Sequence, residues 1–147
     1  MTFLRVKKLV QEAIVPHYVH PGDSGMDLYS VEEAVLLPGE RKLVSTGLSI
    51  AVEKGFEAQV RPKSGLAANF GITVLNTPGT IDSGYRGEVK VILFNSSKQE
   101  YKISKASKIA QLVIAKVEEA KIQEVEELDE TVRGEGGFGS TGLKKHS

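Results

Sequence analysis

Four stretches of this chain gather glycines, charged side chains and hydroxyl groups at spacings that could serve chemistry as well as structure. The first is "HPGDSGMDLYS", residues 20–30, in which Asp23 and Asp27 alternate with glycines at the entry to a predicted strand. A carboxylate such as Asp27 could orient the water molecules around a hard cation, because such ions prefer oxygen ligands. A tight turn capped by its own acidic side chains explains the same residues, and both interpretations stay open.

The second stretch, "RPKSGLA" at residues 61–67, has two cations, a hydroxyl group and a glycine where a predicted strand gives way to a short helical turn. Exposed backbone N–H groups at such a turn, together with Lys63 and Ser64, suit a phosphate group. The alternative is a strand end that is simply exposed to solvent.

The third stretch, "NTPGTIDSGYRGEV" at residues 76–89, has one acid, Asp82, close to Tyr85 in a predicted hairpin tip, and Asn76 adds an amide. The open backbone of a hairpin could bind the edge of a flat base. A carboxylate near a bound water molecule could act as a general base. An ordinary polar loop is the alternative.

The fourth stretch, "RGEGGFGSTG" at residues 133–142, combines a glycine-rich backbone with one aromatic ring and one fixed positive charge. Its glycines permit close approach of the backbone to a ligand. The groups that it could offer are Arg133, Phe138, Ser140 and Thr141. It matches neither the P-loop nor the Rossmann glycine pattern, and a disordered tail is the alternative.

The elements that must position these stretches read as short strands. Apolar runs are cut by turn residues at intervals of roughly 8–12 residues, which is typical of an all-β barrel or sandwich. In residues 56–61, apolar and polar side chains alternate with the period of a half-buried strand. The only predicted helix is the short stretch "SGLAANF". The acidic segment 118–130 allows a short strand or an extended arm, with its charges most simply explained as a solvated face.

Composition narrows the function classes. The chain has 147 residues, no cysteine and equal numbers of basic and acidic residues, 19 each. This indicates one domain without disulfides, and it argues against nucleic acid as a partner. We expect no membrane span and a cytoplasmic location, with the nucleus possible in a eukaryotic or viral setting. His17 and His20 have no third ligand at zinc-site spacing, and His146 lies in the predicted tail, so surface histidines are the favoured interpretation.

Taken in order, the stretches resemble the motifs of the trimeric deoxyuridine triphosphate nucleotidohydrolase (dUTPase) family. The matching segments are "PGDSGMDL", "RPKSGLA", "NTPGTIDSGYRGE", "KIAQLVI" and "RGEGGFGSTG". The resemblance implies an all-β, distorted barrel or jelly-roll-like subunit with at most one short helix. Residues 1–132 would form the domain, and residues 133–147 a flexible arm that closes over the active site.

The resemblance also implies an activity and a set of roles. The enzyme would hydrolyse dUTP to dUMP and pyrophosphate, with Asp82 polarising the water that attacks the α-phosphorus. Tyr85 would pack under the sugar. The uracil edge would be read by Asn76, by the backbone of Thr80, Ile81 and Asp82, and by that of Lys90. The phosphates would be held by Lys63, Ser64, Gly65 and Gln111. In the arm, Phe138 would stack on the base, and the terminal phosphate would be gripped by Arg133, Ser140 and Thr141. Gly139 would also belong to the substrate-binding residues.

Asp27 would orient waters on a Mg²⁺ ion carried by the triphosphate, and three subunits would share each site in a homotrimer. Two features depart from the family pattern: Lys63 stands in place of arginine, and Ala106-Ser107-Lys108 in place of Gly-acid-Arg. Lysine keeps the charge but lacks the planar fork. The alternatives are a dCTP deaminase-type or bifunctional enzyme, and a non-catalytic nucleotide-binding regulator.

Overall fold

A computed structural model describes residues 1–145; the last two residues of the predicted arm, His146 and Ser147, lie outside the described residues. Over the described range the chain forms strands and one short helix, which confirms the predicted all-β class. The elements are β1 (Leu4–Lys8), β2 (Gly25–Tyr29), β3 (Ala34–Leu36), β4 (Arg41–Val52), β5 (Phe56–Arg61), α1 (Ser64–Phe70), β6 (Ile72–Val74), β7 (Gly79–Ile81), β8 (Glu88–Asn95), β9 (Tyr101–Ile103) and β10 (Lys108–Lys116).

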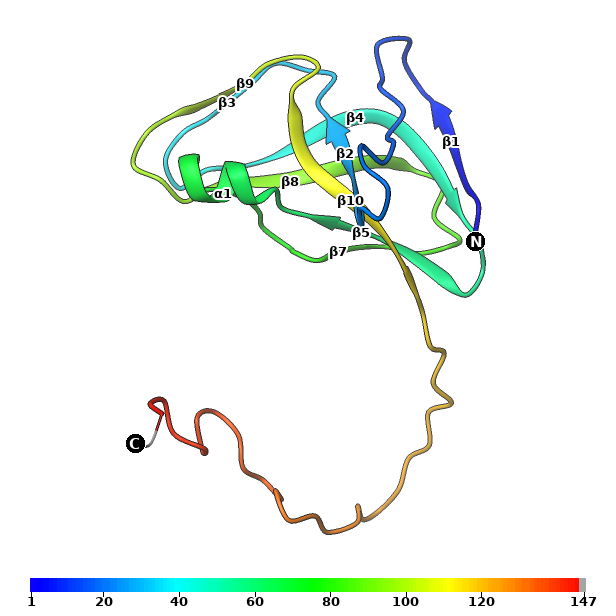
Figure 1. Ribbon diagram of the computed structural model, residues 1–147, viewed down its shortest axis with the longest axis vertical. Helices are drawn as coiled ribbons and strands as arrows, with labels where there is room; N and C mark the ends of the chain where they lie inside the picture. Colours follow the sequence, from blue (N-terminus) through cyan, green and yellow to red (C-terminus); the bar gives the residue numbers. More distant parts are fainter. Residues whose placement is uncertain (146–147) are drawn as a thin grey trace.

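The strands form open sheets rather than a closed barrel (Figure 1). One four-stranded sheet has the order β1-β4-β8-β6, the other has the order β2-β10-β5-β7, and β3 pairs with β9. All the pairings are antiparallel. A single apolar cluster draws on both four-stranded sheets, with Val91 and Leu93 from β8 and Leu28 and Leu112 from β2 and β10. The two sheets therefore enclose one core.

The alternation read from residues 56–61 is confirmed in β5. Ala58 and Val60 are buried, whereas Arg61 at the end of the strand is exposed. Burial of such side chains stabilises the fold by about 1.5–3 kcal/mol for each large aliphatic group. The polar face of the strand then remains available at the surface.

The predicted long hairpin tip differs from the structure in one respect. β7 leaves the sheet of its neighbours β6 and β8 and pairs with β5, so that Ile81 lies opposite Ala58. Ile81 is buried, and Thr80 between the two buried residues of β7 points outward. This short apolar alternation is therefore enough for β7 to pair with the free edge of β5. The pairing in turn determines the position of the residues that follow Ile81.

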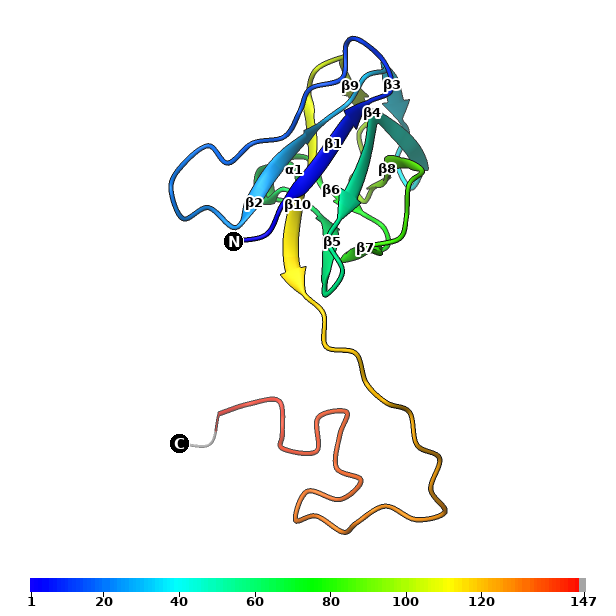
Figure 2. The same ribbon diagram turned by 90° about the vertical axis from the view of Figure 1, so that its right-hand side faces the viewer.

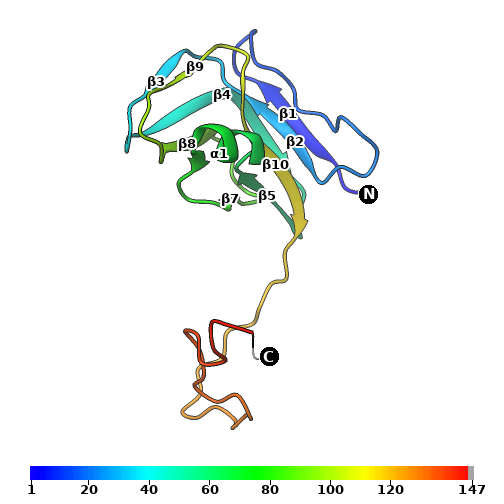
Figure 3. The same ribbon diagram turned by 60° about the vertical axis from the view of Figure 1, so that its left-hand side comes forward.

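Helix α1 (Figure 3) begins at Ser64, after the extended backbone of Lys63, and ends at Phe70, with Gly71 as its C-cap. Gly71 adopts a left-handed conformation with φ of 67°, and its N–H group points to the carbonyl oxygens of Leu66 and Ala67. This is the capping arrangement that favours glycine at a helix C-terminus. The helix has seven residues, too few to cross a bilayer, and the described chain contains no other helix.

Beyond β10 the described chain forms neither helix nor strand and leaves the body of the molecule (Figures 1 and 2). Two large apolar side chains of this segment are almost fully exposed: Ile122 is 88% exposed and Leu128 is 85% exposed. The extended-arm interpretation of residues 118–130 is thus the one that the structure supports.

Ala106 in the turn before β10 has a φ of 62°, in the left-handed region. This conformation costs a residue with a Cβ roughly 1–2 kcal/mol, of which a glycine's larger unfolded-state entropy offsets about half. We expect Ala106→Gly to stabilise the protein by about 0.5–1 kcal/mol in urea unfolding. Gly39 has a φ of 74° with open space around its Cα, so Gly39→Ala is the matched control and should destabilise. A loss of stability in Ala106→Gly would contradict the backbone explanation.

Candidate functional site

A cavity of about 290 Å³ lies beside the loop that follows β7. It unites six of the residues that the sequence predicts for nucleoside recognition: Asn76, Thr80, Ile81, Asp82, Tyr85 and Lys90. Leu43 and Ile92, which face each other across β4 and β8, add apolar surface to its wall. An apolar wall with a few convergent polar groups is the usual make-up of a small-molecule site.

Tyr85 is held in place by the turn that it belongs to. Its hydroxyl group donates a hydrogen bond of 2.9 Å to the carbonyl oxygen of Glu88. The ring lies so close to Gly87 that a Cβ there would overlap it. The Tyr85 side chain can take this position only because residue 87 is a glycine. In this position the ring lines the cavity.

Asp82 lies at the junction of two cavities. It lines the 290 Å³ cavity and also one of about 380 Å³ bounded by Lys54, Phe56 and Val117. The residue is exposed, and within residues 1–145 no hydrogen bond reaches its carboxylate. Its oxygen atoms are therefore available to a hydrogen-bond donor from outside the described chain.

A separate cavity of about 410 Å³ gathers charged groups. It unites three other predicted residues, Asp27, Lys63 and Gln111, and adds His20, Asp23 and Lys108. Ser64 and Gly65 follow Lys63 in the first turn of α1 and are exposed there. Ammonium groups beside an amide and a hydroxyl group suit an anion with several oxygen atoms.

Gln111 is positioned by a close approach of two strands. Its amide nitrogen donates a hydrogen bond of 2.9 Å to the carbonyl oxygen of Pro62. Its amide oxygen lies over Gly25, the first residue of β2, where any Cβ would clash with it. Glycine at position 25 therefore makes room for the Gln111 side chain.

Asp27 is the most strongly paired group of this cavity. Lys63 donates to one carboxylate oxygen, and Lys108 donates to the other at 2.9 Å. Burial raises the pKa of Asp27, but the hydrogen bonds from Lys63 and Lys108 outweigh burial and hold this pKa below its ordinary value. The same contact, through its hydrogen bond from Lys108 to Asp27, raises the pKa of Lys108.

The lowered pKa of Asp27 predicts a loss of stability in acid. Above the ordinary value of 3.8 the ionised carboxylate contributes stability, and this contribution is lost as the pH falls through the lower folded-state pKa. We expect Asp27→Asn to lower the urea midpoint at neutral pH and to flatten the decline of stability in acid. Asp23→Asn is the control, because among the residues that the structure describes its carboxylate is paired only with neighbouring His20. An identical acid dependence in wild type and Asp27→Asn would contradict the assignment.

The donor set bears on the metal that the resemblance implies. Within residues 1–145 no group of three or more acidic or histidine side chains is placed to hold an ion. Mg²⁺ keeps several waters and usually binds through one or two carboxylates together with phosphates of the substrate. A single well-fixed carboxylate, Asp27, in a cavity with cations fits an ion that arrives with a polyphosphate, and it does not fit an ion held by protein alone.

The predicted arm residues are not brought to either cavity within the chain. None of Arg133, Phe138, Gly139, Ser140 and Thr141 lines the cavities described above. Phe138 is fully exposed, and within residues 1–145 the Arg133 guanidinium donates only to the carbonyl oxygen of Gly136, at 2.9 Å. Figures 1 and 2 show this segment far from the sheets.

Sequence reasoning missed two kinds of residue. Leu43 and Ile92 looked like ordinary strand positions, and only the pairing of β4 with β8 places them on the cavity wall. Lys108 was noted as part of a departure from a family pattern, yet no function followed for it. The sequence feature that could have identified Lys108 is its positive charge three residues before Gln111, which was itself predicted for the site.

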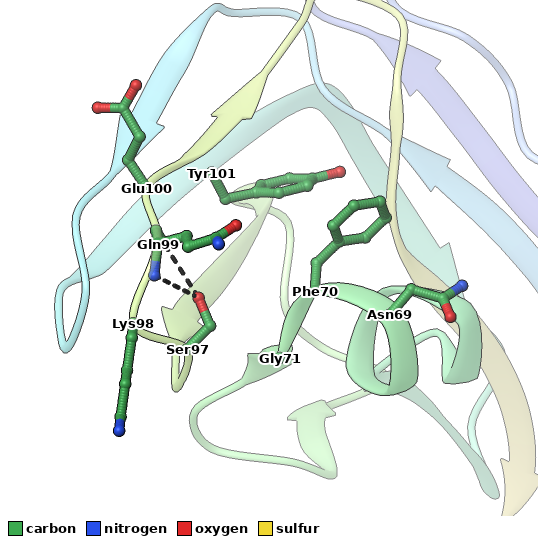
Figure 4. Close-up of a pocket in the computed structure, with 8 residues that line it drawn as sticks. All are labelled: Asn69, Phe70, Gly71, Ser97, Lys98, Gln99, Glu100 and Tyr101. Atoms are coloured by element: carbon green, nitrogen blue, oxygen red, sulfur yellow. Dashed lines mark hydrogen bonds between the residues drawn. The ribbon is translucent and has the colours of Figure 1, made fainter.

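A further cavity, of about 340 Å³, lies at the C-terminal end of α1 (Figure 4). Phe70 and Tyr101 face each other there with ring centroids 5.2 Å apart. The cavity contains none of the residues predicted for the site. Its aromatic pair instead joins the end of α1 to β9.

Comparison with known proteins independently supports the family resemblance that the motifs indicate. The dUTPase family model matches residues 11–142. The deoxyuridine 5'-triphosphate nucleotidohydrolase of Clostridioides difficile is 56% identical over 140 residues, covering 95% of this chain and 98% of the relative. The protein of the same name from Nautilia profundicola is 58% identical over 139 residues, covering 95% and 98%.

Solved structures agree with these matches. The dUTPase of Staphylococcus bacteriophage 80alpha with dUpNHpp superposes with a TM-score of 0.90 at 27% identity, covering 97% of this chain and 100% of that one. A mutant dUTPase from phage phi11 of S. aureus, described with a structural Mg(II) ion, gives a TM-score of 0.80 at 25% identity, covering 87% and 99%. From its motifs, its fold and these matches, the chain belongs to the dUTPase family.

Proposed function

We propose that the protein hydrolyses dUTP to dUMP and pyrophosphate. The observation that carries the proposal is the cavity of about 290 Å³ in which Asp82 lies free beside Tyr85 and Asn76. Its size suits a nucleoside, and the cation-bearing cavity provides for the phosphates. The names of the relatives from Clostridioides difficile and Nautilia profundicola support the same substrate.

Asp82 acts as the general base in the proposed reaction. A water molecule gives a proton to its carboxylate, and the water oxygen forms a bond to the α-phosphorus. The bond from that phosphorus to the bridging oxygen of the β-phosphate breaks, and pyrophosphate leaves with the electron pair. Such displacements depend mostly on positioning and charge stabilisation.

The remaining cavity residues recognise the nucleoside. Asn76 and the backbone of residues 80–82 and of Lys90 bind the uracil edge. Tyr85, fixed by its hydrogen bond to Glu88, packs under the sugar, where a 2′-hydroxyl group would clash. This selects deoxyuridine over uridine.

The phosphates occupy the charged cavity. Lys63, Ser64, Gly65 and Gln111 bind their oxygen atoms. Asp27 would hold, through water, a Mg²⁺ ion that the substrate brings. When bound, this ion neutralises negative charge across the phosphates. Arg133, Gly139, Ser140 and Thr141 close over the terminal phosphate, and Phe138 stacks on the base.

A homotrimer brings these parts together. Two observations support it: the segment that contains the arm lies away from the sheets of its own chain (Figure 2), and the segment leading to it exposes Ile122, Leu128 and Val132. In the trimer one subunit provides the loop with Asp82, a second the phosphate-binding residues and a third the arm. Residues 1–132 then form the domain that carries the two cavities.

The reaction would keep uracil out of DNA and supply dUMP for thymidylate synthesis, a role that fits a protein inside the cell. The deciding experiment incubates purified protein and Mg²⁺ with dUTP, dCTP, dTTP or UTP and measures pyrophosphate. Release from dUTP alone is expected. Ammonia released from dCTP would indicate a deaminase or bifunctional enzyme, and tight binding without turnover would indicate a regulator.

A further inference from the structure

The loop between β7 and β8 contains Asp82 and Tyr85, the two residues on which the proposed chemistry and the selection of the sugar depend. Both side chains are exposed, so the apolar core does not hold them. The groups that hold the loop come instead from β4, the strand that pairs with β8. The proposed function gives these groups of β4 no role.

The pairing of β4 with β8 is interrupted next to the loop. Ser45 pairs with Lys90, whereas Ser49 pairs with Glu88. Three residues of β4 therefore lie opposite one residue of β8, whereas a regular antiparallel ladder pairs residues one to one. Such bulges occur next to functional sites, where they redirect groups of the bulged strand.

Gly47 lies in the middle of this bulge. Its φ of 69° is in the left-handed region, and a Cβ there would lie 2.7 Å from the side chain of Val10. Both observations favour glycine at this position. The Gly47 N–H group donates a hydrogen bond of 3.1 Å to the carboxylate of Glu88. The bulge thus holds the side chain of the first residue of β8.

Ser49, at the end of the bulge, makes a second contact with the loop. Ser49 is buried, and its hydroxyl group donates a hydrogen bond of 2.6 Å to the carbonyl oxygen of Arg86. The guanidinium group of Arg86 donates in turn to the carbonyl oxygens of Ser83 and Tyr85, at 2.6 and 2.9 Å. A chain of hydrogen bonds therefore connects β4 to the backbone of the loop at Tyr85.

Glu88 connects the bulge to the Tyr85 ring. Its carbonyl oxygen accepts the hydrogen bond of 2.9 Å from the Tyr85 hydroxyl group, and its carboxylate accepts the one from Gly47. The position of the ring therefore depends on a residue whose side chain is held by β4. Exclusion of a single hydroxyl group by contact requires a ring that cannot move aside, and such precision comes from the residues that support a site.

We propose that Ser49 and Glu88 are positioning residues, which attach the loop with Asp82 and Tyr85 to the bulge of β4 and thereby determine selection against a 2′-hydroxyl group. The role in selection rests on the proposed function. The attachment of the loop does not, because it can be measured without substrate. Ser49 is not among the residues that line the nucleoside cavity, so an effect of its hydroxyl group on selection must act through the loop.

Hydrogen exchange over residues 82–88 in the ligand-free protein tests the attachment. Ser49→Ala and Glu88→Met each remove one contact and should speed exchange of this loop by roughly 3- to 10-fold, the contribution of one hydrogen bond. Glu88→Gln keeps an acceptor for the Gly47 N–H group and should restore most of the protection. Ser45→Ala, in β4 before the bulge, is the matched control for Ser49. Exchange at the wild-type rate in both Ser49→Ala and Glu88→Met would overturn the attachment.

Steady-state kinetics with dUTP and with UTP tests the role in selection. The ratio of kcat/KM for dUTP to that for UTP should fall by roughly 3- to 10-fold in Ser49→Ala and in Glu88→Met, because a ring that moves aside admits the 2′-hydroxyl group. A structural role alone would lower activity on both substrates alike, and an unchanged ratio would overturn the role in selection. Faster loop exchange in the variants of a protein that does not hydrolyse dUTP would contradict the proposed function alone. Normal dUTP hydrolysis, with exchange and ratio unchanged in both variants, would contradict this inference alone.

Discussion

Replacing Asp82 by asparagine should reduce turnover of dUTP by about 10²–10⁴-fold, the usual contribution of a general base. Asparagine keeps the size of the side chain and removes its ability to take a proton. Because Asp82 is exposed and its carboxylate receives no hydrogen bond within residues 1–145, the substitution should leave the fold intact. Binding of dUpNHpp should therefore stay within a few-fold of wild type.

Steady-state kinetics and calorimetry together separate these effects. The expected pattern is a fall in kcat with little change in the Kd of dUpNHpp. Asp129→Asn is the matched control, since Asp129 is an exposed acid on the segment outside both cavities, and it should behave as wild type. Near-normal turnover in Asp82→Asn would move the base elsewhere, with Asp27 as the next candidate.

Much of the fold follows from local patterns. The alternation of residues 56–61, the turn glycines and the short helical stretch at residues 64–70 predict elements that the structure contains. The pairing of β7 with β5 could not be read in the same way. The apolar alternation around Ile81 is too short to predict a partner strand. The free edge of β5 in the assembled sheet determines that β7 pairs there.

The same distinction between local pattern and strand pairing applies to the cavities. Residues of one loop, such as Asn76, Asp82 and Tyr85, come together because they are close in sequence. The contact of Asp27 with Lys108 depends on the register between β2 and β10, which a single extra residue alters. Register is set by the fit of whole strands, so a reading of each motif by itself gives the residues but not this ion pair.

Truncation after Val132 should leave a folded protein that has lost most of its activity, by about 10²-fold or more if the arm positions the substrate. The removed segment contributes little to the core, because Phe138 is fully exposed and residues 133–135 are exposed as well. The thermal midpoint should therefore stay close to that of wild type. A large drop in the midpoint would show that the arm is a structural part of the fold.

Two single substitutions divide the contribution of the arm. Phe138→Ala should lose the stacking on the base, worth roughly 1–3 kcal/mol in other systems, and keep the arginine, so its defect should be milder than truncation. Arg133→Ala should weaken dUpNHpp more than dUMP, since only the former has a terminal phosphate. Lys144→Ala, an exposed cation just beyond the motif, should change neither.

Mixing two inactive chains locates the arm in the assembly. An Asp82→Asn chain keeps the arm, and a chain truncated after Val132 keeps the base, so mixed trimers would contain sites with both parts if the two come from different subunits. Partial recovery of activity after subunit exchange is expected. Mixed trimers that form without recovery would contradict the assignment of arm and base to different chains.

Ordering the arm costs about 1–2 kcal/mol of backbone entropy per residue, which only ligand contacts offset in a segment without core contacts. Hydrogen exchange over residues 133–142 should therefore slow when dUpNHpp and Mg²⁺ are added, and equal protection with and without ligand would rule out closure of the arm over the substrate.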